Sequence, residues 1–525
     1  MGKEKQRIGI IGGGLTGLTS AYRLSKLGFD VCLFEADASI GGMIKGVSEL
    51  LNSGSADTCS SGSDNSDHRN YTYGNSDPRN SNSVSTDPCR SGSGNFDPCG
   101  SNQSSLETCD SNPSSFYPNN AAPGGSDTHS LGLGYVDDIY HHLFTSDNYL
   151  LQLLEELGLK QHLRWQTAAN ALMHDGILYP FSTPLDLLRF KPIPFFQRLR
   201  TGLAVLKASR LKNWQPLENE LASEWIRKNC GEEAWQTLWL PLLRSKFGSN
   251  EADVSAVWIW NKFKLRGSSR EGSKEKLGYI EGGFQQIADR LKEEITAKGG
   301  QIHTCRQVTK IVPHESSAGK RQFGIETKQG TYSPPFDQII CTIAAEPFLE
   351  IASKLIDSVE YRRKLVDLEY KANICLSVIY EKSLSPWYWT TICDDLPFVV
   401  AVEQDNLRPG QLDKGCLVYF SRYVGIEEEL WQESDQDITD KFVRAAADAF
   451  PGVANNKIIT SRLVRTRYSQ PVIKRHYSNK MPIMKTPVSG LWLAGMAQIY
   501  PEDRGMNYAV RLAEEVTTAV IGVGK

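Results

Sequence analysis

The sequence predicts an α/β domain built on a parallel sheet, joined to an α+β domain of helices and antiparallel strands. A glycine-rich turn between two short apolar strands near the N-terminus predicts the first domain. Strand–helix pairs return near residues 278–345 and 485–525, which indicates later strands of the same sheet. β-type runs recur between Tyr370 and Val472, and this pattern favours a second, mostly antiparallel sheet.

The first strand and the turn after it have the pattern of a phosphate-binding cradle. Residues 7–11 (RIGII) form a short apolar run, followed by the turn G-x-G-x-x-G. The first glycine permits the tight turn, the second lets a pyrophosphate approach the backbone, and the third lets the helix pack close to the strand. Free N–H groups at the positive end of the helix would face the phosphates. The residues expected to contact a nucleotide here are Gly12, Gly14, Leu15, Thr16 and Gly17.

A helix and a second strand complete this βαβ unit. Apolar residues at helical spacing predict a helix from Leu15 to Leu27 that stops at Gly28. The strand Val31–Phe34 then delivers Glu35, which is placed to bind an adenosine ribose hydroxyl. An acid at this position argues against a 2′-phosphate and fits FAD or NAD. The pair Gly41-Gly42 either gives the backbone a second approach to the nucleotide or belongs to an ordinary loop.

Residues 51–130 differ in kind from the rest of the chain. Serine, asparagine, aspartate and glycine dominate, and a ten-residue period runs through the segment. Such polar sequence cannot bury enough apolar surface to offset chain entropy, and its repeats lack the inward apolar position of a β-solenoid. We therefore expect a disordered, low-complexity decapeptide-repeat insertion, since a longer surface loop costs little entropy. Its four cysteines are separated from one another by ten residues or a multiple of ten, but we expect no metal site there.

Charge and composition exclude several classes of protein. The formal net charge of −3 argues against a nucleic-acid binder. No apolar run is long enough to span a membrane, and the N-terminus leads straight into a strand, which leaves no room for a signal peptide. The remaining cysteines are scattered without C-x-x-C spacing. Buried thiols of a cytoplasmic protein are the simplest interpretation, and no metal site is predicted.

Residues 184–264 are expected to be mostly helical, and residues 186–214 within them are both basic and apolar. Arginine and lysine at seven positions interleave with phenylalanine, leucine and isoleucine. This pattern is typical of a helix that lies on a membrane surface, and it also fits a solvated helix face covering a core. We expect a cytoplasmic protein and leave open a peripheral membrane contact through residues 186–214.

Two later segments look like further edges of the nucleotide site. Gly282-Gly283 opens a helix to about Ala297, and a strand from Gln301 to Ile311 follows and carries Val308. Near the C-terminus an apolar strand ends at Gly495, and a polar loop leads to Gly505 and the last helix. The N-terminus of that helix can stabilise negative charge on a flavin ring.

Together these segments resemble FAD-dependent flavoproteins of the amine-oxidase type, which include protoporphyrinogen oxidases, phytoene-desaturase-like enzymes and UDP-galactopyranose mutases. The likeness covers the chain outside residues 51–130, and YHHLFTSD, LLRSKFG and IYPEDRGMNYAVRL resemble a bacterial protoporphyrinogen-oxidase-like branch. It implies a GR2-type flavoprotein with a Rossmann-like FAD-binding domain and a mixed helical and antiparallel-sheet substrate domain. The FAD-binding domain would comprise residues 1–50, 131–147, 278–345 and 485–525. The substrate domain, with its helical subdomain, would comprise residues 148–277 and 346–484.

The resemblance also implies roles for single residues. Val308 would meet the adenine through its backbone, and Met506 would offer its N–H to the flavin pyrimidine end. Gly495 and Met496 would lie by the ribityl chain, although many relatives carry an acid where this chain has Met496. The cofactor-binding residues expected beyond the first glycine turn are Glu35, Gly41, Gly42, Val308, Gly495, Met496, Gly505 and Met506.

The implied chemistry is dehydrogenation of a small-molecule substrate by hydride transfer to FAD. Only one dinucleotide cradle is present, so oxygen, a quinone or another acceptor would reoxidise the flavin. His141 and His142 can move a proton near neutral pH, or can be packed or surface histidines. Tyr500 and Arg504 complete the candidate catalytic set, and Arg504 either binds an anionic substrate or pairs with Glu502 or Asp503. Two further cations, Arg244 and Lys246, either bind carboxylates or phosphates or belong to a solvated basic face.

Two alternative functions stay open at this stage. Tyr179-Pro180 and residues 496–500 also resemble UDP-galactopyranose mutases, in which reduced flavin attacks a sugar without net redox change. The histidine loop that follows the glycine pair in those mutases is not matched by residues 43–45. The other alternative is a flavoprotein-like scaffold without catalysis.

Overall fold

The computed structural model describes residues 5–47, 136–272, 274–315, 319, 321–412, 414–453 and 455–523. The insertion predicted for residues 51–130 lies outside these residues. The described ends on either side of it are adjacent, because β3 (Gly46–Val47) pairs antiparallel with β4 (Val136–Asp137), with Val47 opposite Val136. The chain therefore leaves and re-enters the fold at one place.

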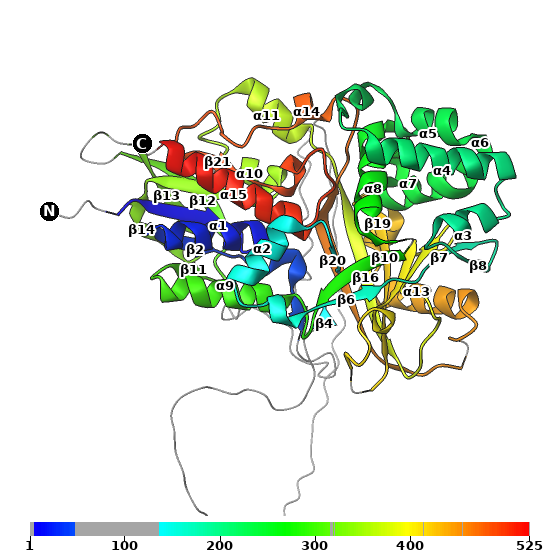
Figure 1. Ribbon diagram of the computed structural model, residues 1–525. Helices are drawn as coiled ribbons and strands as arrows, with labels where there is room; N and C mark the ends of the chain where they lie inside the picture. The colour runs from blue at the N-terminus through cyan, green and yellow to red at the C-terminus, as the bar shows by residue number, and fades with distance from the viewer. Residues whose placement is uncertain are drawn as a thin grey trace, which may run out of the picture. The chain divides into compact units, whose positions relative to one another are not determined.

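A parallel sheet of five strands carries the N-terminal glycine turn (Figure 1). Its strand order is β11–β2–β1–β15–β21, and every neighbouring pair is parallel. Side chains alternate between its faces, so Ile8 and Ile10 enter one apolar cluster and Ile11 enters another. The strands are β1 (Arg7–Ile11), β2 (Asp30–Phe34), β11 (Gln301–His303), β15 (Gln338–Cys341) and β21 (Leu491–Leu493).

Helices cover one face of this sheet, and a small antiparallel sheet covers the other. The helices α1, α2, α9 and α15 enclose Ile8 and Ile10 (Figure 1). The antiparallel sheet, with the strand order β12–β13–β14, encloses Ile11 together with α10 and α11. The helices predicted after the first glycine turn and after Gly283 are confirmed. The bounds are α1 (Leu15–Lys26), α2 (Asn148–Glu156), α9 (Gln285–Ala297), α10 (Ala345–Ile351), α11 (Val359–Val366), α15 (Met506–Val523), β12 (Val308–Glu315), β13 (Arg321–Thr327) and β14 (Gly330–Phe336).

The strand predicted from Gln301 to Ile311 is wrong as a single element. Its first part, β11, belongs to the parallel sheet, and its second part, β12, opens the antiparallel sheet. Between them Cys305 has a φ of 52°, a left-handed conformation that ends an extended run. Cys305 is also disulfide-bonded, so the expectation of thiols is wrong at this residue. The free described cysteines are Cys32, Cys230, Cys341, Cys375, Cys393 and Cys416.

A seven-stranded sheet forms the second framework, in the order β20–β16–β19–β18–β17–β7–β8. Its neighbours pair antiparallel except β17 and β7, which run parallel, so the predicted mostly antiparallel sheet is confirmed. Helix α13 (Asp435–Ala449) packs on it through Ile438 and Phe442. The strands are β7 (Asn170–His174), β8 (Ile177–Pro180), β16 (Tyr370–Tyr380), β17 (Trp389–Ile392), β18 (Val400–Glu403), β19 (Cys416–Val424) and β20 (Ile458–Pro471). A smaller sheet, β5–β10–β6, contains β5 (Leu143–Phe144), β6 (Leu163–Thr167) and β10 (Lys274–Ile280).

Tryptophan and leucine hold together a cluster of helices between residues 184 and 268 (Figure 1). Trp225, Trp235, Trp239, Trp258 and Trp260 are all buried in its core. The helices are α3 (Pro184–Arg189), α4 (Phe195–Arg210), α5 (Ala222–Cys230), α6 (Glu232–Ala234), α7 (Leu240–Phe247) and α8 (Ala256–Ser268). The predicted class, an α/β framework combined with an α+β framework, is therefore confirmed. Among the described residues no helix has the length and apolar character needed to cross a membrane.

Candidate functional site

The glycine turn after β1 leaves room on one side only. A Cβ atom on Gly17 would lie 2.0 Å from the Gly12 carbonyl oxygen, so the close contact between turn and helix requires glycine there. A Cβ atom on Gly14 would meet nothing nearer than the Gly42 Cα atom at 4.0 Å. Packing within the protein therefore does not explain the glycine at position 14. A ligand that approaches the backbone does explain it, and this is the position where a pyrophosphate would lie.

The start of α1 presents backbone donors beside Gly14. The Leu18 N–H donates to the Gly14 carbonyl over 2.9 Å, so the three preceding N–H groups point ahead of the helix. One of these belongs to Thr16, whose hydroxyl donates to Ala509 over 3.3 Å and ties α1 to α15. Leu15 is buried, so its side chain packs in the core and only its backbone can face a ligand.

Glu35 lies at the carboxyl end of β2, across from the glycine turn. Its carboxylate accepts the Gly13 N–H over 2.6 Å and the Asp37 N–H over 2.9 Å, which fixes it at the mouth of the cradle. The backbone of Glu35 also bonds to that of His303 and Arg306 at 2.9 and 2.8 Å. These bonds bring the segment leading to Val308 alongside the predicted ribose acid, although Val308 itself is distant in sequence.

The second glycine pair closes over the first turn. The Gly41 N–H donates to the Gly13 carbonyl over 2.8 Å, and a Cβ atom on Gly42 would lie 2.9 Å from the Gly14 Cα atom. Gly42 has a φ of 59°, which glycine adopts without strain. The pair is therefore built into the cradle wall and is more than an ordinary loop.

The C-terminal segment supplies a second helix N-terminus at the same edge of the parallel sheet. Gly495 follows β21, and a Cβ atom there would lie 2.7 Å from the Ile343 carbonyl oxygen. Met496 is half-buried in the short turn that follows, and Met506 begins α15 in a buried position. Gly505 is exposed, and a Cβ atom there would make only an ordinary contact, 3.8 Å from the Cδ2 atom of Tyr508. Helices α1 and α15 thus follow β1 and β21 in the chain, and the carboxyl ends of these two strands lie at one edge of the sheet.

His141 lies near Phe284, the residue after Gly282-Gly283, and the charge of Arg504 acts on it. Its ring packs edge-on to Phe284 with the centroids 5.9 Å apart, and its buried Nδ1 atom has no partner among the described residues. Burial lowers the pKa of His141 to about 4, and the charge of Arg504 contributes in the same direction. Near neutral pH the ring therefore stays neutral in this environment, and a catalytic role for His141 stays a prediction.

His142 faces the opposite way and packs against the antiparallel sheet. Its Nδ1 atom lies 2.9 Å from the Tyr388 hydroxyl, and its ring packs edge-on to Phe144, Tyr388 and Trp389. Burial raises the pKa of Tyr388 well above its usual value, so this hydroxyl keeps its proton. His142 therefore contributes a structural link between two sheets.

Arg504 belongs to a group of charges around the buried Asp503 that the sequence does not reveal as a unit. Arg504 donates to Gln470 and to the Tyr423 hydroxyl, and Lys246 donates to the same Gln470 oxygen over 3.1 Å. Asp503 pairs with Lys262 at 2.5 Å and with Lys246 at 3.6 Å. Burial alone would raise the pKa of Asp503, but the three cations hold it well below its usual value. Three cations thus surround one carboxylate.

Burial lowers the pKa of Lys246 to about 8. The charge of Asp503 opposes this change, and the charge of Arg504 contributes to it. Lys246 was predicted as an anion-binding candidate together with Arg244. Arg244 instead points outward, with 62% of its side chain exposed, and pairs with Glu251. The alternative partner predicted for Arg504, Glu502, pairs with Arg511.

Tyr500 ties the terminal loop to the helical cluster. Its hydroxyl donates to the Glu218 carboxylate over 2.6 Å, and its ring packs against Trp214 and Tyr477. Its side chain is therefore engaged in packing and is not brought together with Arg504.

Asp137 and Arg408 form a buried ion pair that sequence reasoning missed. Their nearest atoms are 3.1 Å apart, and the side chains are 1% and 2% exposed. Asp137 also accepts the Phe284 N–H over 3.0 Å, and its carbonyl accepts the Tyr419 hydroxyl. Burial raises the pKa of Asp137 to about 6 against the influence of Arg408. The pair fixes the segment that carries His141, and only long-range contacts could reveal it.

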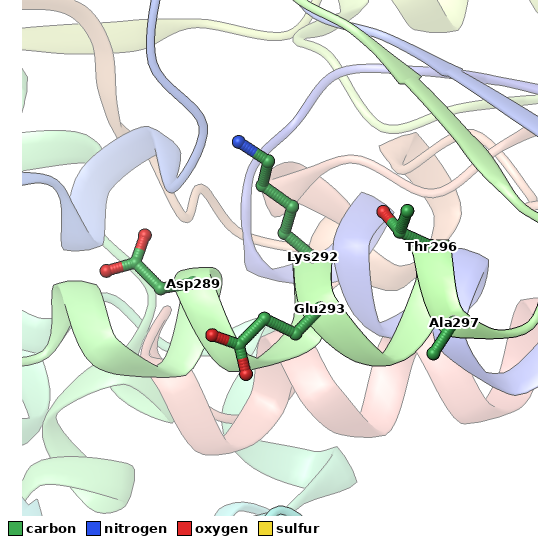
Figure 2. Close-up of a pocket in the computed structure, with 5 residues that line it drawn as sticks. All are labelled: Asp289, Lys292, Glu293, Thr296 and Ala297. Carbon is green, nitrogen blue, oxygen red and sulfur yellow. The ribbon is translucent and has the colours of Figure 1, made fainter. Parts of the chain in front are cut away.

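A surface depression of about 510 Å³ lies away from these residues, on α9. Figure 2 shows the side chains that line it, Asp289, Lys292, Glu293, Thr296 and Ala297, all from one helix. It gathers no groups from different elements and has no part in the site.

The arrangement defines a class of protein: a flavoprotein with one dinucleotide cradle facing a second, antiparallel-sheet framework. Residues 125–521 match the family model of flavin-containing amine oxidoreductases, and residues 10–70 match that of an NAD(P)-binding Rossmann-like domain. The chain belongs to the flavin-containing amine oxidoreductase family, and it is a FAD-dependent oxidoreductase.

Solved structures share the fold at low sequence identity. A candidate protoporphyrinogen oxidase from Exiguobacterium sp. 255-15 matches with a TM-score of 0.67 and 15% identity, covering 100% of both chains. Cyclohexylamine oxidase from Brevibacterium oxydans IH-35A matches with 0.63 and 13%, covering 99% of this chain and 100% of the other. A reduced UDP-galactopyranose mutase matches with 0.64 and 13%, covering 99% and 96%. None of the curated proteins compared with the chain matches it.

Proposed function

We propose that this protein dehydrogenates an anionic small molecule by hydride transfer to bound FAD. The observation that carries the proposal is the group of Lys246, Lys262 and Arg504 around the buried carboxylate of Asp503. Lys246 and Arg504 share this carboxylate with Lys262, so an anionic group beside them would be bound by charge-assisted hydrogen bonds. His141, which contacts this group electrostatically, lies on the segment joined to the glycine cradle.

The cofactor would be held at both helix N-termini. The backbone at Gly12, Gly14, Leu15, Thr16 and Gly17 would bind the pyrophosphate, Glu35 the adenosine ribose, and Val308 the adenine. Gly41 and Gly42 would line the cradle, and Gly495, Met496, Gly505 and Met506 would border the ribityl chain and the flavin ring. Bound FAD would supply the acceptor for the hydride.

The remaining residues would bind and orient the substrate. Arg504 and Lys246 would hold its anionic group, and Tyr423 would orient Arg504. Neutral His141 would offer a hydrogen bond without carrying charge, while His142 and Tyr500 would support the walls. The substrate loses a hydride and a proton, and oxygen or a quinone takes up the two electrons.

The proposal also divides the chain into domains. The FAD-binding domain would comprise residues 1–50, 131–147, 278–345 and 485–525. The substrate domain would comprise residues 148–277 and 346–484, with residues 51–130 as an insertion. A peripheral membrane contact would run through residues 186–214.

The test is an anaerobic titration of the purified, FAD-loaded protein, followed by the flavin absorbance. Carboxylated candidates, such as a porphyrinogen, are compared with neutral polyenes and with amines. Bleaching by the anionic compounds, weakened by Arg504→Met, would support the proposal. Bleaching by amines alone would exclude an anionic substrate. Isomerisation of UDP-galactose by the dithionite-reduced protein would replace dehydrogenation with mutase chemistry.

A further inference from the structure

The outer face of α3 and α4 exposes a continuous group of large apolar side chains. Phe196 is 77% exposed and Leu203 is 66% exposed. Along α4 the exposed positions follow the three- and four-residue spacing of one helix face. We name this group the α3–α4 surface, and its apolar members are Leu185, Leu188, Phe195, Phe196, Leu199, Leu203 and Leu206.

The opposite face of α4 already has its partners. Thr201, Ala204 and Ala208 are buried, and α4 packs there against α5 and α8. Small side chains let these helices approach closely, while the bulky ones are turned outward. The core of the helical cluster therefore does not need the exposed apolar residues, and a helix that only covered this core would not require phenylalanine and leucine on its outer face.

Basic side chains surround the α3–α4 surface. Residues 186–214 contain seven lysines and arginines but one acid, Asp186, in a chain whose overall charge is −3. Asp186 is occupied, since it caps α3 by accepting N–H groups of Ser182 and Thr183. None of the seven forms an ion pair with a residue that the structure describes, and Arg198 and Arg200 donate to the carbonyls of Leu188 and Lys228. The other five are exposed: Arg189, Lys191, Lys207, Arg210 and Lys212.

We propose that the α3–α4 surface docks onto the surface of an anionic lipid bilayer. Exposed phenylalanine and leucine at the centre can enter the boundary between headgroups and acyl chains, as in amphipathic helices that lie in the membrane plane. The surrounding lysines and arginines can reach the anionic headgroups along their aliphatic stems.

A second copy of the chain fits this surface less well. Face-to-face pairing of two α3–α4 surfaces would bring their unpaired bases together with a single acid from each copy, and like charges oppose such pairing. An anionic bilayer satisfies both the apolar centre and the basic rim. This docking is independent of the substrate and of the flavin reaction.

The test is co-sedimentation of the full-length, FAD-loaded protein with sucrose-loaded vesicles. We expect binding to vesicles that contain phosphatidylglycerol, little binding to pure phosphatidylcholine, and loss of binding as sodium chloride is raised. The paired variant Phe196→Ser/Leu203→Ser should weaken binding by about tenfold or more, because two large apolar side chains are removed from the bilayer. Arg189→Glu/Lys207→Glu should weaken binding by a similar factor, of the order expected for basic residues at an anionic surface.

Matched controls change equally exposed residues elsewhere. Val366→Ser on α11 removes an apolar side chain that is 68% exposed, and Lys354→Glu reverses an exposed charge. Both should bind vesicles as the parent protein does. The flavin spectrum and the melting temperature of every variant report whether it is folded. Absence of vesicle binding, or equal binding by all variants, would overturn the proposal. Self-association without lipid that Phe196→Ser/Leu203→Ser abolishes would assign the surface to a second copy instead.

Discussion

At the scale of single residues, the site depends on two kinds of side chain that look ordinary in the sequence. Gly14 and Gly17 stand three residues apart, yet one is required by the protein's own packing and the other leaves open space. Lys246 and Lys262 look like helix-surface lysines, yet both reach the buried Asp503. Their significance comes from their surroundings.

The two glycines predict different consequences for alanine. Gly17→Ala should destabilise the fold, because its Cβ would lie 2.0 Å from a backbone oxygen. Gly14→Ala should fold with a nearly unchanged melting temperature but lose most of its FAD. Thermal unfolding of the apoprotein and fluorescence titration with FAD measure the two effects. Normal FAD affinity in Gly14→Ala would contradict the assigned position of the pyrophosphate.

Lys246 predicts a pH dependence of substrate binding. Its pKa is lowered to about 8, so the side chain is charged below that pH and loses its charge above it. The KM of an anionic substrate should therefore rise above about pH 8, while kcat changes little. In Lys246→Met the KM should be high throughout and lack this step. Arg244→Met, which changes an exposed cation on the same helix, serves as the control and should keep the parent profile.

At the scale of elements, the segment β4–β5 joins the two frameworks. Asp137 holds the turn before α9 through Phe284 and is paired with Arg408 beyond β18. His142 reaches Tyr388 before β17. His141, between these anchors, is thereby fixed beside Arg504. The positions of helices and strands follow local patterns, whereas this joint depends on contacts between residues 147 and 271 positions apart.

Breaking the buried pair predicts a large and pH-dependent loss of stability. Arg408→Met leaves the Asp137 carboxylate buried without its cation and should cost about 3–5 kcal/mol of unfolding free energy. The loss should shrink as the pH falls toward 6, because Asp137 without Arg408 takes up its proton above that pH and loses its buried charge. The double variant Asp137→Asn/Arg408→Met should lose less than Arg408→Met alone. Denaturant unfolding at pH 5 and pH 8 measures both effects, and equal losses at the two pH values would contradict this account.

At the scale of the whole molecule, the two described ends of the insertion meet in a short hairpin. Val47 and Val136 are paired partners, so a short connection can replace everything between them. Cys305 is disulfide-bonded and the other described cysteines are free, so the comparison is made in a Cys305→Ser background. There, replacing residues 48–135 by an Asn-Gly turn should preserve the FAD content and the melting temperature of Cys305→Ser, because lengthening or shortening a surface loop changes the free energy only slightly. The flavin absorbance per protein chain and a thermal melt measure this outcome. Loss of FAD would show that the insertion takes part in the fold.

The sequence by itself determined the βαβ cradle, because its glycines, helix and ribose acid lie within one contiguous stretch and obey local rules. It also determined the mostly antiparallel second sheet, through the recurring β-type runs. Only the tertiary structure decided that residues 301–311 serve two sheets, since the left-handed turn at Cys305 carries no clear sequence signal. The neutral state of His141 and the gathering of Lys246, Lys262 and Arg504 around Asp503 were likewise decided there. Burial and charge depend on which distant segments meet, and no local pattern contains that information.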